Sequence, residues 1–275
     1  MPRAPMPSVR TAPAPPWSPE GGSVPRSGSA GGGPHLVTPA VRNEILKRML
    51  SLRQSSVDRV AELTGAAASD LKRFRRELLE SPVPQLLVQR GAGLPMAREL
   101  PQGALLYLLI RAALPERVVE TGVRPGYSTA WLLAALEANG SGELVSLGPG
   151  SADGRMPGVS AGAVGQFVAP SLRRRWSLVL GNSEDRLDAI LREGPALDVF
   201  FYDNGTDLDR TRFELRRAWA ALSDRGILLA HHVDTNSAWA EFCGWQGSTP
   251  QLLDAGPPAL GALSLRGAAA PRRAA

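Results

Sequence analysis

The chain has 275 residues, of which 43% are hydrophobic, and a formal net charge of +5. These totals are ordinary for a globular protein with room for one large domain and additional segments. No apolar run approaches the roughly 20 residues that a membrane-spanning helix needs, and residues 1–22 lack the apolar stretch of a secretory signal. The single cysteine, Cys243, excludes an internal disulfide and a multi-cysteine zinc site. We therefore expect a cytoplasmic protein.

The excess positive charge lies near the two ends of the sequence. Residues 1–40 hold three arginines and one glutamate, and residues 266–275 hold three more arginines, so the stretch between them is neutral. A neutral middle argues against a groove that follows nucleic-acid phosphates. We expect neither nucleic acid nor a membrane as a partner. An alternative, in which the basic ends tether the chain to an acidic partner, stays open.

The composition divides the chain into four segments. Residues 1–40 hold 10 of the 24 prolines and cannot bury enough apolar surface to fold, so we predict a disordered tail. Residues 41–99 are predicted to form a helical cap, whose second helix lies within 67–81. This helix pair also resembles a helix-turn-helix, although pairs that simply pack as a cap are far commoner. Residues 100–268 should form the main domain and 269–275 a basic tail.

Beyond residue 104, helical and strand patterns alternate. Strands are predicted at 117–121, 143–147, 176–181, 197–203 and 226–230, and helices at 104–114, 128–140, 183–194 and 209–222. Short, nearly continuous apolar strands that alternate with helices are typical of an α/β protein with a parallel sheet covered on both faces. Residues 250–267 are predicted to add two short antiparallel strands at the sheet edge.

The segment RVVETGVRPGYSTAWLLAAL, residues 117–136, joins the first strand of this series to its helix. Ligands of open α/β sheets bind at such turns. Gly122 allows a tight turn, Gly126 allows the backbone to approach a ligand closely, and Ser128 opens a helix whose free amides favour a carboxylate or phosphate. Glu120 would repel a phosphate but attract an ammonium. A ligand with both an ammonium and a carboxylate therefore fits better than a dinucleotide; a turn that binds nothing is the alternative.

This segment resembles the first motif of class I S-adenosylmethionine-dependent methyltransferases, in the branch with the pattern V-V-E-T-G-V-x-x-G-x-S that is similar to small-molecule and sugar O-methyltransferases. The resemblance continues in order through GQFVAP, RRRWSLVLGNSEDRL and LDVFFYDNGTDLDRTRFELRRAWAALSDRGILLAHHVDTNSAWAEF, over about residues 100–245. It implies a Rossmann-like, seven-stranded, mostly parallel sheet, with Glu120 at the methionine amino group. The cofactor-binding residues that it implies are Glu120, Thr121, Gly122, Gly126, Tyr127, Ser128, Gly148, Asn182, Ser183 and Asp203.

Two positions depart from the family pattern. Gly148 stands where the second strand usually ends in an acidic residue that holds both ribose hydroxyls. Either Ser146 or loop amides substitute for it, or cofactor binding is weakened or lost. Asn182 stands where the family often carries aspartate, but its amide oxygen can still accept a hydrogen bond from the adenine amino group. Asp203, after the fourth strand, is retained.

Two adjacent histidines, His231 and His232, follow the fifth strand, where the resemblance implies acidic or amide residues. Because related O-methyltransferases hold a divalent ion there, Asp203, His231 and His232 would be the matching ligands of Mg²⁺ or Mn²⁺, although two imidazoles are softer than magnesium prefers. The favoured interpretation is one catalytic imidazole that takes the acceptor's proton, with Asp203 orienting it. Asp234 and Asn236 would line the same rim. Histidines that only pack are the remaining alternative.

These features predict transfer of a methyl group from S-adenosylmethionine to a hydroxyl (or amine) of a small molecule, such as a sugar or secondary metabolite. The cap segment 41–99 is placed to roof that acceptor. The competing hypothesis is an inactive methyltransferase-fold protein that serves as a binding or assembly module, which Gly148 and the two histidines favour. The sequence leaves the acceptor and the choice between oxygen and nitrogen open, and a homodimer also stays open.

Overall fold

The computed structural model describes residues 51–81, 83, 100–149, 164–205 and 207–266, together with Asn43 and Lys47. All of them belong to one compact unit, Leu36–Ala275. The predicted tails 1–40 and 269–275 lie outside the described residues, as does most of the first predicted cap helix. Within the described ranges, no helix is both long enough and apolar enough to cross a membrane.

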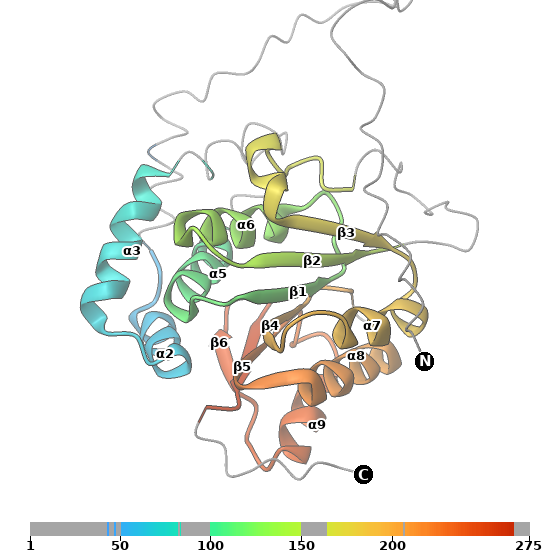
Figure 1. Ribbon diagram of the computed structural model, residues 1–275. Coiled ribbons are helices and arrows are strands. Elements are labelled where there is room, and N and C mark those ends of the chain that lie inside the picture. The colour runs from blue at the N-terminus through green and yellow to red at the C-terminus, as the bar shows by residue number, and fades with distance from the viewer. Residues whose placement is uncertain are drawn as a thin grey trace, which may run out of the picture. The chain divides into compact units, whose positions relative to one another are not determined.

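A seven-stranded sheet in the order β3-β2-β1-β4-β5-β7-β6 forms the centre of this unit (Figure 1). The parallel strands are β1 (Arg117–Thr121), β2 (Glu143–Gly148), β3 (Trp176–Leu180), β4 (Leu197–Tyr202) and β5 (Leu222–His231). At one edge, β7 (Leu260–Ser264) runs antiparallel to β5, and β6 (Leu252–Asp254) runs antiparallel to β7. The predicted α/β, Rossmann-like, mostly parallel sheet is confirmed, and the antiparallel pair lies at its edge.

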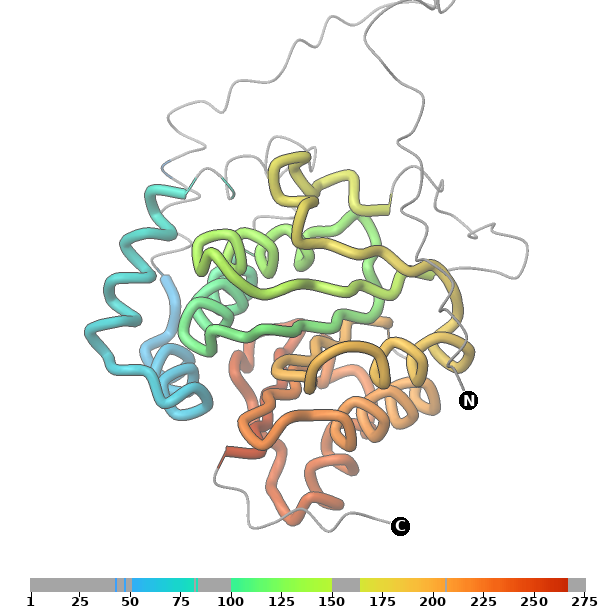
Figure 2. The backbone as a smooth tube through the Cα atoms, viewed as in Figure 1, coloured from blue at the N-terminus to red at the C-terminus, as the bar shows by residue number. Residues whose placement is uncertain are grey.

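Helices cover both faces of the sheet (Figures 1 and 2). On one face lie α5 (Leu100–Ala113) and α6 (Tyr127–Asn139), and on the other lie α7 (Ser183–Arg192), α8 (Leu208–Ala221) and α9 (Ala238–Trp245). Each face has its own cluster of buried apolar side chains. This double burial is the physical reason that strands such as β4, in which every residue except Asp198 is buried, consist of nearly uninterrupted apolar residues.

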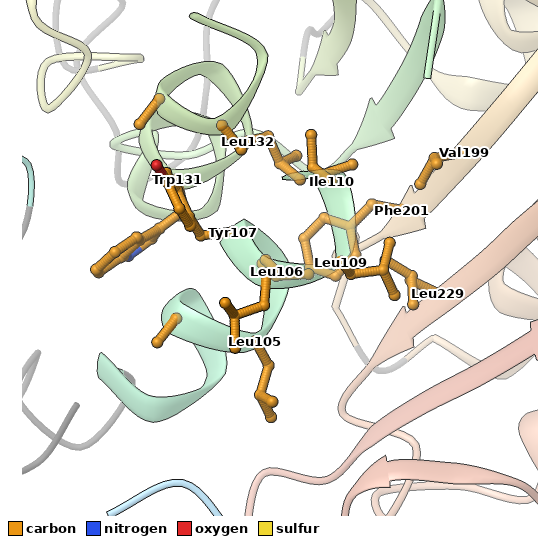
Figure 3. Packing of buried hydrophobic residues seen from close by; sticks show 14 of the residues in the cluster. Leu105, Leu106, Tyr107, Leu109, Ile110, Trp131, Leu132, Val199, Phe201 and Leu229 are labelled. Atoms are coloured by element: carbon orange, nitrogen blue, oxygen red, sulfur yellow. The ribbon is translucent and has the colours of Figure 1, made fainter. Parts of the chain in front are cut away.

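Helix α5 is buried along most of its length and organises one of the two cores. Its residues from Gln102 to Ile110 are all buried, because the sheet lies on one side of the helix and other helices lie on the other. Figure 3 shows this packing, with side chains of α5 meeting those of α6, β4 and β5. The labelled residues are Leu105, Leu106, Tyr107, Leu109, Ile110, Trp131, Leu132, Val199, Phe201 and Leu229.

The described part of the predicted cap consists of α2 (Gln54–Thr64) and α3 (Ala68–Glu80), which pack against α5. Arg111 of α5 donates hydrogen bonds to both oxygens of Glu77, each at 2.9 Å, and its guanidinium lies 4.5 Å from the Phe74 ring centroid. No described residue of the cap lines any of the cavities discussed below. The described helices therefore stabilise α5 rather than roof an acceptor, and residues 84–99 lie outside the description.

Candidate active site

A cavity of about 340 Å³ lies at the carboxyl ends of β1, β4 and β5, and we call it the large cavity. Six of the residues predicted from sequence share its wall: Gly126, Tyr127, Ser128, Asp203, His231 and His232. The remaining wall comes from Gln102, Gly103, Leu106, Arg124, Pro125, Phe167, Phe201 and Leu260. The large cavity thus combines an apolar body with one polar corner, the usual composition of a small-molecule site.

The turn between β1 and α6 needs both of its glycines. Gly122 has a φ of 92°, and a Cβ there would lie 2.2 Å from the Asp203 carbonyl oxygen. Gly126 has a φ of 88°, and its Cβ would lie 2.9 Å from the Cα of Gly165. Side chains are therefore excluded by conformation and by space alike. The turn is held further by Thr121, whose carbonyl oxygen accepts from the Asp203 amide at 2.9 Å.

Glu120 is fully buried beneath the turn and lines none of the described cavities. Its carboxylate accepts hydrogen bonds from the hydroxyls of Ser128 at 2.6 Å, Thr129 at 2.8 Å and Ser146 at 2.7 Å. Burial raises the pKa of Glu120 to about 7, and the negative charge of Asp203 adds to the rise while the three hydroxyls oppose it. The sequence predicted direct contact with a methionine ammonium; in the structure, Ser128 stands between Glu120 and the cavity.

Asp203, His231 and His232 meet at the polar corner. The Nδ1 of His231 lies 2.9 Å from Oδ1 of Asp203, and the Nε2 of His232 lies 4.0 Å from the same oxygen. β5 ends at His231, and His232 adopts a φ of 58°. Because the strand has ended, the alternation of side chains no longer applies, and the two rings lie with centroids 4.2 Å apart. Burial lowers the pKa of His232, and the neighbouring His231 lowers it further.

These three residues also satisfy the chemistry of a metal site. Each offers one ligand atom, and the three atoms all lie within 4.8 Å of one another. Two imidazole nitrogens and one carboxylate oxygen suit a borderline ion such as Zn²⁺ better than Mg²⁺. The outer nitrogen of His231 contacts Oε1 of Gln102 at 2.8 Å, which is how metal-binding histidines are commonly held. The donor set therefore fits a divalent ion of this kind.

A second, small cavity of about 40 Å³ is lined by Gly148, Asn182 and Ser183, three residues that the sequence assigned to the cofactor. Leu147, Pro149, Gly181, Asn204 and Arg210 complete its wall. A Cβ on Gly148 would lie 2.9 Å from Val123 and 3.1 Å from Leu180, so apolar side chains occupy the space of the usual acidic one. Ser146 does not replace that acid, because its hydroxyl is buried between Glu120 and the Trp176 indole.

The two predicted rim residues, Asp234 and Asn236, both accept hydrogen bonds from backbone amides. Oδ1 of Asp234 accepts from the Ala259 amide at 2.9 Å, and Oδ1 of Asn236 accepts from the Ala238 amide at 2.9 Å. Neither residue lines the large cavity, but Asn236 lines a further cavity of about 10 Å³ together with His231 and His232. Sequence reasoning missed Gln102, Arg124, Asn204 and Arg210, which do line cavities. Only Gln102 left a usable signal, since it is a buried polar residue in an otherwise apolar helix.

Comparisons with known proteins find a family model that matches part of the chain. A model of the family described as "Methyltransferase domain" matches residues 119–233. A search of the curated proteins finds no match to this sequence.

Three solved structures illustrate the similarity. The methyltransferase PaMTH1 of Podospora anserina, bound to SAH, is 21% identical over 56% of this chain and 62% of its own, with a TM-score of 0.42. The SAM-bound O-methyltransferase TomG of Streptomyces achromogenes is 20% identical over 70% of this chain and 71% of its own, with a TM-score of 0.41. The calicheamicin methyltransferase CalS11 is 18% identical over 87% of this chain and 99% of its own, with a TM-score of 0.48. The chain thus spans less than two thirds of the first of these proteins.

The matched segment carries most of the candidate site. That segment begins in β1 and ends just beyond β5, so it contains the glycine turn, Asp203 and both histidines. It also contains every polar residue that lines the large or the small cavity, except Gln102. Residues 119–233, on a seven-stranded, mostly parallel sheet, are therefore similar to the methyltransferase domain, and the chain has the α/β, Rossmann-like fold expected of it.

Proposed function

We propose that the protein transfers the methyl group of S-adenosylmethionine to a hydroxyl of a small molecule held in the large cavity. One observation carries this proposal: the imidazoles of His231 and His232 line the same cavity as the start of α6. The cofactor brings the reactive methyl group, so the protein must align the acceptor with it and remove the acceptor's proton. A neutral imidazole beside the methionyl site does the second task.

His232 is the better candidate for the base. Its side chain is 36% exposed, against 12% for His231, and both ring nitrogens of His231 already face hydrogen-bond partners. The lowered pKa of His232 keeps its imidazole neutral and able to accept a proton. Its left-handed backbone is uncommon for a non-glycine residue, and such conformations cluster at functional sites.

The cofactor would bind across both cavities. The free amides at the start of α6 suit its carboxylate, and Asp203, whose side chain is 25% exposed, suits its ammonium. Glu120 contributes from below by fixing the hydroxyls of Ser128 and Thr129. The adenosine end would lie toward the small cavity, with Asn182 and Ser183.

The acceptor would be a small, largely apolar molecule with a hydroxyl group. Leu106, Phe167, Phe201 and Leu260 give the large cavity its apolar wall, which suits an aromatic or alicyclic secondary metabolite better than an unmodified sugar. Arg124 is exposed at the rim and lines the cavity, so it is placed to meet an anionic substituent.

A metal-assisted form of the same reaction is the second candidate, because the Asp203, His231 and His232 donors lie within 4.8 Å of one another. A divalent ion held by these residues would lower the pKa of the acceptor hydroxyl. In that case His232 would act as a ligand rather than as the base, and turnover would require the ion.

Calorimetric titration with S-adenosylmethionine and S-adenosylhomocysteine, with and without Mg²⁺, Mn²⁺ or Zn²⁺, is the first test. We expect micromolar binding of both compounds, followed by methyl transfer in a screen of hydroxylated aromatic acceptors. If the folded protein binds neither compound, the proposal is wrong and the chain acts as a binding or assembly module. Turnover that disappears on chelation and returns with Zn²⁺ would select the metal-assisted form.

A further inference from the structure

Gln102 is a buried polar residue whose role the proposed function leaves unexplained. It lies in the first turn of α5, is 8% exposed, and stands outside the matched residues 119–233. Nevertheless it lines the large cavity beside His231. A buried amide in an apolar helix is stable only if its donors and acceptor are paired.

The turn between β6 and β7 fixes the Gln102 amide nitrogen. Nε2 of Gln102 donates to the carbonyl oxygen of Pro258 and also faces the Gly256 carbonyl oxygen and Oδ2 of Asp254, each at 3.5 Å. All three partners are acceptors. If the amide were reversed, its oxygen would point at three other oxygens, so the network determines its orientation.

This orientation directs the amide oxygen at His231. Oε1 of Gln102 lies 2.8 Å from Nε2 of His231. An amide oxygen can only accept, so this contact requires a hydrogen on Nε2. The other ring nitrogen, Nδ1, lies 2.9 Å from Oδ1 of Asp203, and because a carboxylate oxygen also accepts, His231 makes both hydrogen bonds only with a hydrogen on each ring nitrogen.

We propose that Gln102 is a positioning residue of the active site, which accepts a hydrogen bond from Nε2–H of His231 and holds the opposite side of that ring against Asp203. The β6–β7 turn thereby sets the orientation of a ring 129 residues away from Gln102 in the sequence. Calling the site catalytic rests on the proposed function, whereas the hydrogen bond itself does not. His231 is fixed at both nitrogens by this arrangement, and His232 keeps access to the acceptor.

Ring-nitrogen NMR of the ¹⁵N-labelled full chain tests the proposal without cofactor or acceptor. The chain has three histidines, and a His231→Gln variant identifies the resonances of His231 by their loss. We expect Nε2 of His231 to carry hydrogen in the wild type at pH 8. In Gln102→Met, which keeps the length of the side chain without its amide, the ratio of Nε2-hydrogenated to Nε2-bare His231 should fall about fivefold, the equivalent of one hydrogen bond.

Gln251→Met is the matched control, because the Gln251 side-chain amide donates to the carbonyl oxygen and hydroxyl of Thr249, and Gln251 lines none of the described cavities. It should leave the His231 resonances unchanged. A wild-type His231 with a bare Nε2 overturns the proposal even if Gln102→Met fails to fold. Identical His231 resonances in Gln102→Met and the wild type also overturn it. Absence of S-adenosylmethionine binding would contradict the proposed function but leave these spectra interpretable.

Discussion

The large cavity and the small cavity hold their polar groups in different ways. Beside the large cavity lie two separate clusters, in one of which three hydroxyls fix Glu120, while in the other Asp203 and Gln102 fix His231. Around the small cavity, the position that usually carries a ribose-binding acid is Gly148, and apolar side chains fill the space beside it. In the proposed function, the methyl-transfer end is therefore preorganised, whereas the adenosine end lacks a carboxylate and offers the Asn182 amide instead.

Truncation of His232, the proposed base, should have the largest effect of the substitutions considered. It should change turnover without changing cofactor affinity. His232→Ala removes the imidazole that we assign to proton removal, so turnover should fall about 10²- to 10⁴-fold. Calorimetry should give the wild-type affinity for S-adenosylmethionine, because the histidine lies at the acceptor side of the cavity. His35→Ala is the matched control and should leave both quantities unchanged. Equal losses of affinity and turnover would show that His232 is structural.

The buried carboxyl of Glu120 should make the free energy of unfolding depend on pH. Its folded pKa of about 7 lies above the ordinary value of 4.5, so the native state binds more protons between these values. Stability should therefore fall as pH rises from about 4.5 to 7, by up to about 3 kcal/mol. Glu120→Gln should remove this component, as measured by urea unfolding at pH 5, 6, 7 and 8.

A residual pH dependence is expected in Glu120→Gln, because burial also raises the pKa of Glu214. Glu143→Gln, which alters an exposed glutamate at the start of β2, serves as the control. If the free energy of unfolding changes with pH in the same way in the wild type and in Glu120→Gln, the raised pKa does not belong to Glu120.

The fold was predictable because it depends on patterns that are local in sequence. Buried parallel strands produce short apolar runs, and the glycines at 122 and 126 mark the turn because no other residue fits there. Elements with weaker local signals were missed: α2, α9 and the 3₁₀ helix η3 (Pro170–Arg175). β5 begins at Leu222, before the predicted strand, since Leu222 pairs with Leu197 across an irregular register.

The site was predictable only where side chains follow strand ends. Asp203, His231 and His232 were identified in this way, because the carboxyl ends of neighbouring parallel strands meet at one edge of the sheet. The contact between Gln102 and His231 depends on the packing of α5 and the β6–β7 turn, which no spacing encodes. The burial of Glu120 beneath Ser128 likewise depends on side-chain directions that become visible only in the folded chain.

An acidic residue at Gly148 should not restore the usual ribose contact. A Cβ there meets Val123 and Leu180 at 2.9 and 3.1 Å, and overpacking of this kind costs about 1–3 kcal/mol. Gly148→Asp should therefore lower the free energy of unfolding by that amount without tightening S-adenosylmethionine binding. Gly244→Ala is the control, because nothing lies within 4 Å of its added Cβ. A tighter-binding, stable Gly148→Asp would show that the small cavity still accepts the family's pattern.

The smallest effect is expected from Asn182, and it tests whether the adenosine end works through single neutral hydrogen bonds. Asn182 precedes α7 and lines the small cavity, and a neutral hydrogen bond contributes about 1 kcal/mol. Asn182→Ala should therefore weaken S-adenosylmethionine binding about fivefold, while turnover at saturating cofactor stays at the wild-type level. Adenosine alone, titrated into both proteins, should show the same ratio, because the lost contact belongs to the adenine. If the ratio appears for S-adenosylmethionine but not for adenosine, Asn182 acts on the methionyl end, and the division of labour between the two cavities is wrong.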